Sequence, residues 1–413
     1  MTDAICYCDG VLHIDKVPVS EIAQACGTPV YIYSAAVMHA RYRLLETALP
    51  EIDICYGMKA CDTLAVINLF IELGAGIDVV SGGEIQRVLA ARGDPRRIVF
   101  SGVGKTDEEI TFALRSGVGQ INAESASEVI QIARLAQAAK VRAPVALRLN
   151  PDIPAGGHQK IQTGHARAKF GMAVHEIGAL YGQDIAGIDW RGLAVHIGSQ
   201  IHQVAPYDKA FGVLAELITT LAHPVTHIDL GGGFAVAYRA GDPVLDLSDY
   251  RAMVARHFDP KVVRLLVEPG RFLTAPAAIL VARVIHDKHT GNHRHVIIDA
   301  AMNDLLRPSL YDAFHNIIPI QETHAPASPA DIVGPICETG DTFTRDHTLP
   351  SLEPGALVAI CDVGAYGAVM ASNYNARPRA PQVLVDGTRF RVIRPRESFA
   401  DMIRGETDAL SHQ

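Results

Sequence analysis

Residues 52–60 read IDICYGMKA, a short apolar run that leads into Lys59. The β-branched and apolar residues predict a buried strand, and the mouth of such a strand is a poor position for a surface charge. Desolvation lowers the pKa of a lysine, so its amine can lose a proton and attack a carbonyl group. The alternative is a structural lysine whose stem lies along the strand end while its ammonium reaches water.

The same pattern of strand and helix recurs along the first two-thirds of the chain. Eight β-branched runs alternate with stretches of helical period such as 63–73, 107–116 and 207–221. Ser125 followed by Glu128 fits a helix-capping box. Eight units in roughly 245 residues predict an α/β fold of the (β/α)8 TIM-barrel type. A doubly wound open sheet is the alternative, which the lack of Gly-x-Gly-x-x-Gly after the first strand disfavours. The predicted strands are Ile52–Tyr56, Ile77–Val80, Ile98–Ser101, Gly119–Ala123, Val145–Asn150, Leu193–Gly198, Thr226–Leu230 and Leu265–Glu268.

A second pattern begins after about residue 276. Apolar runs flank Thr290-Gly291-Asn292, and two more flank Asp386-Gly387, which is a strong hairpin signal. We therefore expect a barrel over residues 31–275. Residues 276–413, together with 1–30, are expected to form an antiparallel β-domain of the barrel or sandwich type.

Polar residues or glycines stand at the carboxyl end of every predicted barrel strand. TIM barrels carry out their chemistry at this end, so we expect these residues to surround one active site. They are Lys59, Asp78, Ser101, Glu124, Asn150, His196, Gly231 to Gly233, and Glu268.

Three of these strand ends suit an anionic ligand with a planar ring. Glycines 231–233 let a phosphate approach their backbone N–H groups. Glu268 can pair with a pyridinium nitrogen, and Arg271 offers a planar fork for a carboxylate. His196 can stack on a flat ring. The structural alternatives are a tight turn, an internal ion pair between Glu268 and Arg271, and a core histidine.

Two features of the β-domain are less specific. Cys337 beside Glu338 would by default be a buried, inert thiol. The tract His286, His289, His293 and His295 invites a metal site, but it falls in a predicted hairpin loop. We expect a solvated loop there and no metal site.

Composition limits the partners and the compartment. The 413 residues are 48% hydrophobic and carry a net charge of −8, which argues against nucleic acid and anionic membranes as partners. Seven cysteines without regular spacing suggest free thiols in a reducing compartment. We find no signal-peptide pattern, and the longest apolar stretch, 64–80, contains Glu72 and Asp78. We expect a cytoplasmic protein that does not cross a membrane.

The ordered motifs of this chain resemble those of the diaminopimelate decarboxylases. These enzymes are pyridoxal-phosphate-dependent decarboxylases with an alanine-racemase-like barrel. The resemblance runs from about residue 30 to residue 380. One visible departure is Gly57, where the family usually has alanine. The motifs lie at residues 56–60, 78–84, 169–171, 196–200, 231–233, 268–271, 302–311, 337–338, 364–366 and 375–379.

The resemblance implies how the cofactor, pyridoxal 5'-phosphate, would be held. Lys59 would form the Schiff base and His196 would stack on the ring. The phosphate would lie against Gly231, Gly232 and Gly233 and against the turn Glu268-Pro269-Gly270-Arg271, with Glu268 on the ring nitrogen. Tyr366 would touch both cofactor and substrate.

The resemblance also implies the residues that meet an amino-acid substrate. Arg271, Arg307 and Tyr311 would bind its carboxylate, and Glu338 its distal ammonium. Cys337 would donate the proton. In the family Cys337 and Glu338 reach the site across a homodimer interface, so shared active sites are expected.

The implied reaction is the decarboxylation of meso-2,6-diaminopimelate to L-lysine and CO2, the last step of lysine biosynthesis. One alternative is a lysine or ornithine decarboxylase of the same fold, but ornithine decarboxylases typically have aspartate where this chain has Glu338. The other is a non-catalytic decoy that binds pyridoxal phosphate, which need not retain both Lys59 and Cys337. We therefore favour the first reaction.

Overall fold

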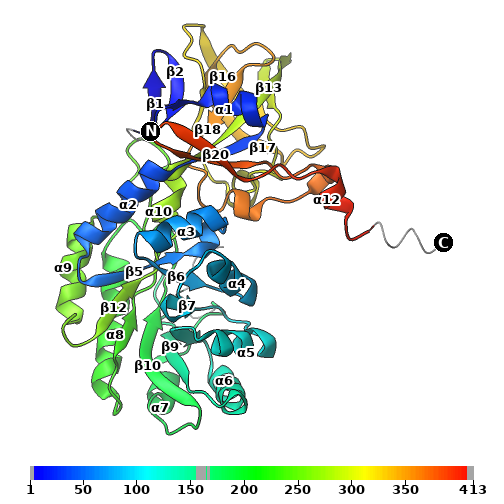
Figure 1. Ribbon diagram of the computed structural model, residues 1–413. Coiled ribbons are helices and arrows are strands. Elements are labelled where there is room, and N and C mark those ends of the chain that lie inside the picture. Colours follow the sequence, from blue (N-terminus) through cyan, green and yellow to red (C-terminus); the bar gives the residue numbers. More distant parts are fainter. Residues whose placement is uncertain (1–3, 155–163, 165–167, 407–413) are drawn as a thin grey trace. The chain divides into compact units, whose positions relative to one another are not determined.

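The computed structural model describes residues 4–154, 164 and 168–406 (Figure 1). By its internal contacts the chain divides into two compact units. The barrel unit comprises 41–237 and 242–273, and the sheet unit comprises 1–40, 238–241 and 274–413. The sequence analysis placed residues 31–40 with the barrel, and the structure differs there because β4 (Val30–Ser34) pairs with strands of the sheet unit.

The barrel unit is built on the predicted TIM barrel. Eight parallel strands close in the order β10-β11-β12-β5-β6-β7-β8-β9 within the described chain. Pairing of Leu265 with Ile52 joins the last strand to the first. The strands are β5 (Ile52–Gly57), β6 (Gly76–Val79), β7 (Ile98–Phe100), β8 (Gln120–Ala123), β9 (Ala143–Leu149), β10 (Ile188–Val195), β11 (His227–Asp229) and β12 (Arg264–Val267).

Helices follow the barrel strands, as the predicted α/β alternation requires (Figure 1). They are α3 (Leu64–Glu72), α4 (Gly82–Ala90), α5 (Asp107–Ser116), α6 (Ala126–Ala139), α7 (Val174–Leu180), α8 (Ala205–Thr220), α9 (Leu247–His257) and the short α10 (Arg271–Thr274). The helix α2 (Ala35–Ala48) precedes the first barrel strand, and the 3-10 turns Met58–Ala60 and Pro95–Arg97 lie between strands and helices.

Capping residues explain where several of these helices begin. Thr106 and Glu109 form a complete capping box at α5. At α6 the predicted box is only half formed. The Ser125 hydroxyl accepts the N–H of Glu128, but the Glu128 carboxylate accepts the N–H of Glu124 and an ammonium hydrogen of Lys105. A buried ion pair therefore replaces the reciprocal bond of the box.

The sheet unit contains a nine-stranded sheet and a small three-stranded one. The main path runs β17-β16-β14-β13-β4-β19-β20, with β18 paired to β13 and β15. Most neighbours are antiparallel as predicted, but β14 with β16 and β19 with β4 are parallel. The strands are β13 (Ala278–Thr290), β14 (His293–Ile298), β15 (Ile317–Pro319), β16 (Ala327–Val333), β17 (Thr342–Pro350), β18 (Leu357–Ile360), β19 (Gln382–Asp386) and β20 (Arg389–Arg394), with β1 (Ile5–Cys8), β2 (Val11–Ile14) and β3 (Val17–Pro18) in the small sheet.

Among its described residues the sheet unit carries the helices α1 (Val19–Cys26), α11 (Arg307–Tyr311) and α12 (Phe399–Ile403), together with the first residues of α2. Among the residues that the structure describes, we find no helix that is both long and apolar enough to cross a membrane.

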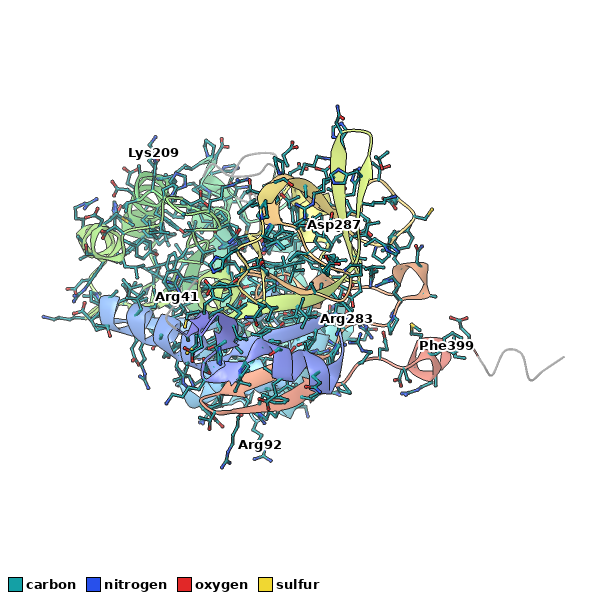
Figure 2. All side chains as sticks on the ribbon, turned by 90° about the horizontal axis from the view of Figure 1, so that it is seen from above. Arg41, Arg92, Lys209, Arg283, Asp287 and Phe399 are labelled. Carbon is teal, nitrogen blue, oxygen red and sulfur yellow. The ribbon has the colours of Figure 1, made fainter. Side chains whose placement is uncertain are left out.

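The histidine tract lies on strands rather than in the loop that the sequence predicted. Strand pairing continues to Thr290 and His293, so only Gly291 and Asn292 form the tip of the β13–β14 hairpin. Asp287, which Figure 2 labels on this hairpin, binds the buried Arg294 at 2.6 Å. This ion pair ties the two strands together and accounts for the regular pairing through the tract.

Candidate active site

Lys59 faces a buried carboxylate at the carboxyl end of the barrel. Strand β5 ends at Gly57, and the 3-10 turn that follows places the Nζ of Lys59 at 2.5 Å from Oδ2 of Asp78 in β6. The Asp78 side chain is fully buried, whereas that of Lys59 is 33% exposed. The other oxygen of Asp78, Oδ1, has no hydrogen-bond partner among the described residues. The ammonium thus pairs with a buried carboxylate, although part of the Lys59 side chain remains exposed.

Two more carboxyl groups lie beside this pair. Burial, together with Asp229 and Asp78, raises the pKa of Glu268 well above the ordinary value, while Lys59 lowers it. Burial also raises the pKa of Asp229. A hydrogen bond between Asp229 and Glu268 requires a proton on one of them, and a cation beside the pair would take the place of that proton. The floor of the site therefore favours a ligand that carries a cationic nitrogen.

A polar layer supports Asp229 from within the barrel. Asn122 donates from Nδ2 to Asp229 at 2.9 Å and to Ser101 at 3.1 Å. Gln120 in turn donates to Oδ1 of Asn122 at 2.8 Å. The sequence analysis noted Ser101 but missed Gln120, Asn122 and Asp229. The sequence did contain a signal for two of them: Gln120 and Asn122 lie two residues apart in one strand, so their side chains point to the same face.

His196 is held in one neutral form. Its Nδ1 lies 3.0 Å from the N–H of Gly232, so Nδ1 accepts and the ring proton is on Nε2. Burial, together with the charges of Lys59 and Arg148, lowers the pKa of His196 well below its ordinary value. His196 therefore presents an uncharged, oriented ring close to Lys59.

Close packing requires glycine at positions 231–233. A Cβ at Gly232 would lie 2.1 Å from the carbonyl oxygen of Glu268, and one at Gly231 would lie 2.4 Å from that of Val195. Gly233 has a φ of +97°, which favours glycine. The N–H groups of Gly231 and Gly232 donate to Asp229 and His196, which leaves the N–H of Gly233 as the one of the three that no described residue accepts. The loop brings three strand ends into contact and retains one donor for an anion.

Two buried arginines stand near these strand ends. Arg271 is 8% exposed and contacts Oγ of Ser199 through Nε at 3.3 Å and Nη2 at 3.2 Å. Arg148 is paired with Glu124 at 2.7 Å and lies over the ring of Phe170. Gly171 also donates its N–H to Glu124. The motif 169–171 therefore packs against the ion pair between Arg148 and Glu124.

The remaining predicted residues lie in the sheet unit. Arg307 begins α11 and is 5% exposed. Its Nη1 lies 2.9 Å from Nε2 of His315, and its guanidinium lies over the ring of Tyr238. Tyr311 ends the same helix. The sequence analysis missed Tyr238 and His315, which no spacing rule connects to Arg307.

Cys337 and Glu338 occupy an exposed loop, so the default of a buried thiol is wrong. The carboxylate of Asp341 fixes this loop by accepting the N–H of Ile336 at 2.7 Å and that of Met302 at 2.6 Å. Glu338 accepts the hydroxyl of Tyr374 at 3.0 Å.

Contacts join this loop to α11. Ser309 donates to the carbonyl oxygen of Gly340 at 2.7 Å, so Arg307 and Tyr311 share a framework with Cys337. Tyr366 has a φ of +57°, a left-handed conformation that is uncommon outside glycine and frequent at functional sites. The predicted residues thus form two groups, one in each unit.

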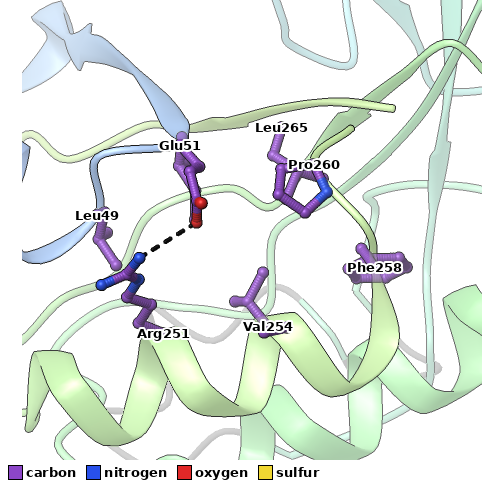
Figure 3. A pocket seen from close by; sticks show the side chains of 9 residues that line it. Leu49, Glu51, Arg251, Val254, Phe258, Pro260 and Leu265 are labelled. Carbon is purple, nitrogen blue, oxygen red and sulfur yellow. Dashed lines mark hydrogen bonds and ion pairs between the residues drawn. The ribbon is translucent and has the colours of Figure 1, made fainter. Parts of the chain in front are cut away.

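A pocket elsewhere on the barrel is not this site. It is shallow and largely apolar, and the ion pair between Glu51 and Arg251 at 3.3 Å borders it (Figure 3). Ile52 begins β5 and Leu265 lies near the start of β12, so the pocket is at the opposite end of the strands from Lys59. The lining residues are Leu49, Glu51, Ile52, Arg251, Val254, Ala255, Phe258, Pro260 and Leu265.

Comparison with known proteins agrees with the fold. The family described as "Pyridoxal-dependent decarboxylase, pyridoxal binding domain" matches residues 35–275. Barrel and match together define the class of the protein, which is a pyridoxal-dependent decarboxylase.

Relatives define the family within this class. The diaminopimelate decarboxylase of Pseudomonas aeruginosa is 42% identical and covers 98% of this chain and 99% of its own length. That of Aquifex aeolicus is 37% identical over 97% of both chains. The crystal structure of diaminopimelate decarboxylase from Helicobacter pylori complexed with L-lysine has a TM-score of 0.91 and 38% identity, and it covers 95% of this chain and 100% of that one. The chain belongs to the diaminopimelate decarboxylase family.

Proposed function

We propose that this protein converts meso-2,6-diaminopimelate to L-lysine and CO2 with pyridoxal phosphate, as the last step of lysine biosynthesis. The observation that carries the proposal is Lys59, whose amine lies beside the buried Asp78 and within electrostatic range of Glu268 and His196. This constellation occurs in a chain that is 42% identical to a diaminopimelate decarboxylase along nearly its full length.

The residues of the barrel fit the cofactor. Pyridoxal phosphate, when bound, takes up the electron pair that a departing carboxylate leaves behind. Lys59 would hold it covalently, Glu268 would face its ring nitrogen, and His196 would lie against its ring. The fit rests on the surplus of buried carboxyls and on Oδ1 of Asp78, which has no partner among the described residues.

Each of these groups has a definite electrostatic task. Glu268 is buried among other carboxyl groups, so a cationic ring nitrogen beside it would be strongly favoured. That nitrogen would therefore keep its proton. His196 is neutral and therefore adds no competing positive charge at the ring. Asp78 holds the Lys59 amine in the site at 2.5 Å.

We assign substrate recognition to Arg271, Arg307, Tyr311, Tyr366 and Glu338. Both arginines are buried, at 8% and 5% exposure. A substrate such as ornithine lacks the second carboxylate and would leave a buried guanidinium unsatisfied, at a cost of roughly 3–5 kcal/mol. Sites of this kind can reject the deficient substrate by about 10⁴-fold. This argument favours diaminopimelate over simpler diamino acids.

We assign to Cys337 the return of a proton to the reacting carbon. Its loop is exposed in the single chain and is held rigidly by Asp341. We propose that the protein is a homodimer in which Cys337 and Glu338 complete the other subunit's site. We also propose a cytoplasmic location, because Cys8, Cys26, Cys337 and Cys361 are thiols rather than disulfides.

The alternative of a lysine or ornithine decarboxylase has weaker support. The lysine/ornithine decarboxylase of Vibrio vulnificus in complex with putrescine is only 22% identical, with a TM-score of 0.79, which shows a common fold alone. The decoy alternative would not require both Lys59 and Cys337.

A product assay separates the three possibilities. The protein is incubated with pyridoxal phosphate and with meso-diaminopimelate, L-lysine or L-ornithine in turn, and the products are identified by mass spectrometry. We expect L-lysine from meso-diaminopimelate. Diamines from lysine or ornithine, without lysine from meso-diaminopimelate, would establish the first alternative. Bound cofactor without any product would establish the decoy.

A further inference from the structure

We propose that His315 is a positioning residue that holds Arg307 in the orientation needed to bind the substrate carboxylate. The inference rests on the proposed function, because it takes Arg307 as a substrate-binding group. It adds a residue outside the motifs that the family resemblance identified.

The hydrogen bonds of His315 fix its tautomer. The side chain is 1% exposed, and its Nδ1 lies 2.8 Å from the carbonyl oxygen of Cys361. A carbonyl only accepts, so Nδ1 carries the proton and Nε2 carries a lone pair. That lone pair accepts an N–H of Arg307 at 2.9 Å. The imidazole is therefore neutral and oriented by the backbone of β18's end.

Tyr238 restricts the same guanidinium from a second direction. The guanidinium carbon of Arg307 lies 4.7 Å from the centre of the Tyr238 ring. The Tyr238 ring stands at 80° to the His315 ring, with their centres 5.4 Å apart. One contact lies at the edge of the guanidinium and the other on its face, so together they define the plane in which the fork can meet a carboxylate.

A histidine is well suited to this task because it accepts a hydrogen bond without carrying a charge. A carboxylate in its place would neutralise Arg307 and compete with the substrate carboxylate. The pKa of Asp362, which burial raises to about 6, responds to the charge of Arg307.

The test uses two amides of similar polarity that replace opposite ends of the imidazole. In His315→Gln the amide oxygen can reach the place of Nε2 and accept from Arg307. In His315→Asn the amide can reach only the place of Nδ1, which keeps the Cys361 contact and loses the Arg307 contact. We expect His315→Asn to raise KM for meso-diaminopimelate about 10- to 100-fold, the range for a lost bond to a charged group. His315→Gln should stay within about 5-fold of the wild type, and kcat and cofactor absorbance should change little in either.

The results distinguish this inference from the function on which it rests. Equal KM values for the two variants, or losses confined to kcat and folding, would overturn the role of His315 alone. A wild-type protein that makes no lysine would overturn the proposed function and this role with it. If His315→Asn fails to fold, Tyr238→Leu replaces it. Loss of the ring should raise KM, Tyr238→Phe should preserve it, and equal KM values for this pair would again overturn the inference.

Discussion

Replacement of Glu124 by glutamine should destabilise the barrel strongly. The Glu124 side chain is 3% exposed and accepts from Arg148 at 2.7 Å and from the N–H of Gly171 at 2.7 Å. Glutamine has one acceptor oxygen, so its NH2 group must face one of these two donors. The change also leaves the 9% exposed Arg148 side chain without its counter-charge.

The expected magnitude follows from this burial. Breaking one partner of a buried ion pair costs about 3–5 kcal/mol. In a unit of roughly 230 residues each kcal/mol lowers the melting temperature by about 2–4 °C, so we expect a decrease of about 6–20 °C. Glu46→Gln is the matched control. Glu46 pairs with Arg43 on the surface, where the side chains are 44% and 58% exposed, and such a pair contributes about 0–1 kcal/mol.

The single tryptophan of the chain gives a direct assay. Trp190 is buried in β10 and pairs with β9, the strand that carries Arg148. Its fluorescence during thermal unfolding therefore reports on the barrel. A decrease below about 3 °C, or one equal to that of Glu46→Gln, would refute the reasoning. Removal of both charges in Glu124→Gln with Arg148→Met should recover much of the loss.

Three further changes test other parts of the structure. Gly232→Ala should abolish cofactor binding or folding, because the added Cβ would lie 2.1 Å from a backbone oxygen. The control Gly178→Ala, whose Cβ meets nothing within 4 Å, should be neutral or stabilise α7 by up to about 1 kcal/mol, and equal melting temperatures for the two variants would contradict this. Asp341→Ala removes two hydrogen-bond acceptors from the Cys337 loop, and it should reduce turnover at least about 10-fold while the cofactor absorbance is retained. Full activity of this variant would reject the role of Asp341. Burial raises the pKa of Asp304 to about 6, so between pH 4 and pH 6 the native state keeps a proton that the unfolded state loses. The stability of the wild type relative to Asp304→Asn should therefore fall by about 2–3 kcal/mol from pH 4 to pH 7, and a difference in melting temperature that does not vary with pH would count against this.

Local patterns were sufficient to predict the barrel. The predicted range 107–116 matches α5, and the other predicted helices and strands of the barrel mostly agree within a few residues. The strand β4 was missed, although it pairs on both sides within the sheet unit. Its five residues, VYIYS, are all buried, so they show none of the alternation that marks a half-buried strand. Pairing with distant strands determines its place.

The site could be predicted only where a strand end marked it. Lys59, His196 and Glu268 follow barrel strands, and the closed barrel brings them to one end. Asp229 and His315 could not be found in this way, because contacts with other elements define their roles. Asp229 accepts from Asn122 of β8, and Nδ1 of His315 donates to the carbonyl oxygen of Cys361. Such hydrogen bonds depend on the folded backbone and leave no periodic trace in the sequence. Whether Cys337 and Glu338 act across a dimer remains a prediction.

The central claim is that the amine of Lys59 carries the cofactor. Reduction of the cofactor-loaded protein with borohydride, followed by peptide mapping, tests it most directly. We predict a single pyridoxyl-phosphate adduct on the peptide that contains Lys59, and no adduct on Lys105, whose ammonium is enclosed by Glu128 and two carbonyl oxygens. An adduct on another lysine, or none at all, would contradict the account.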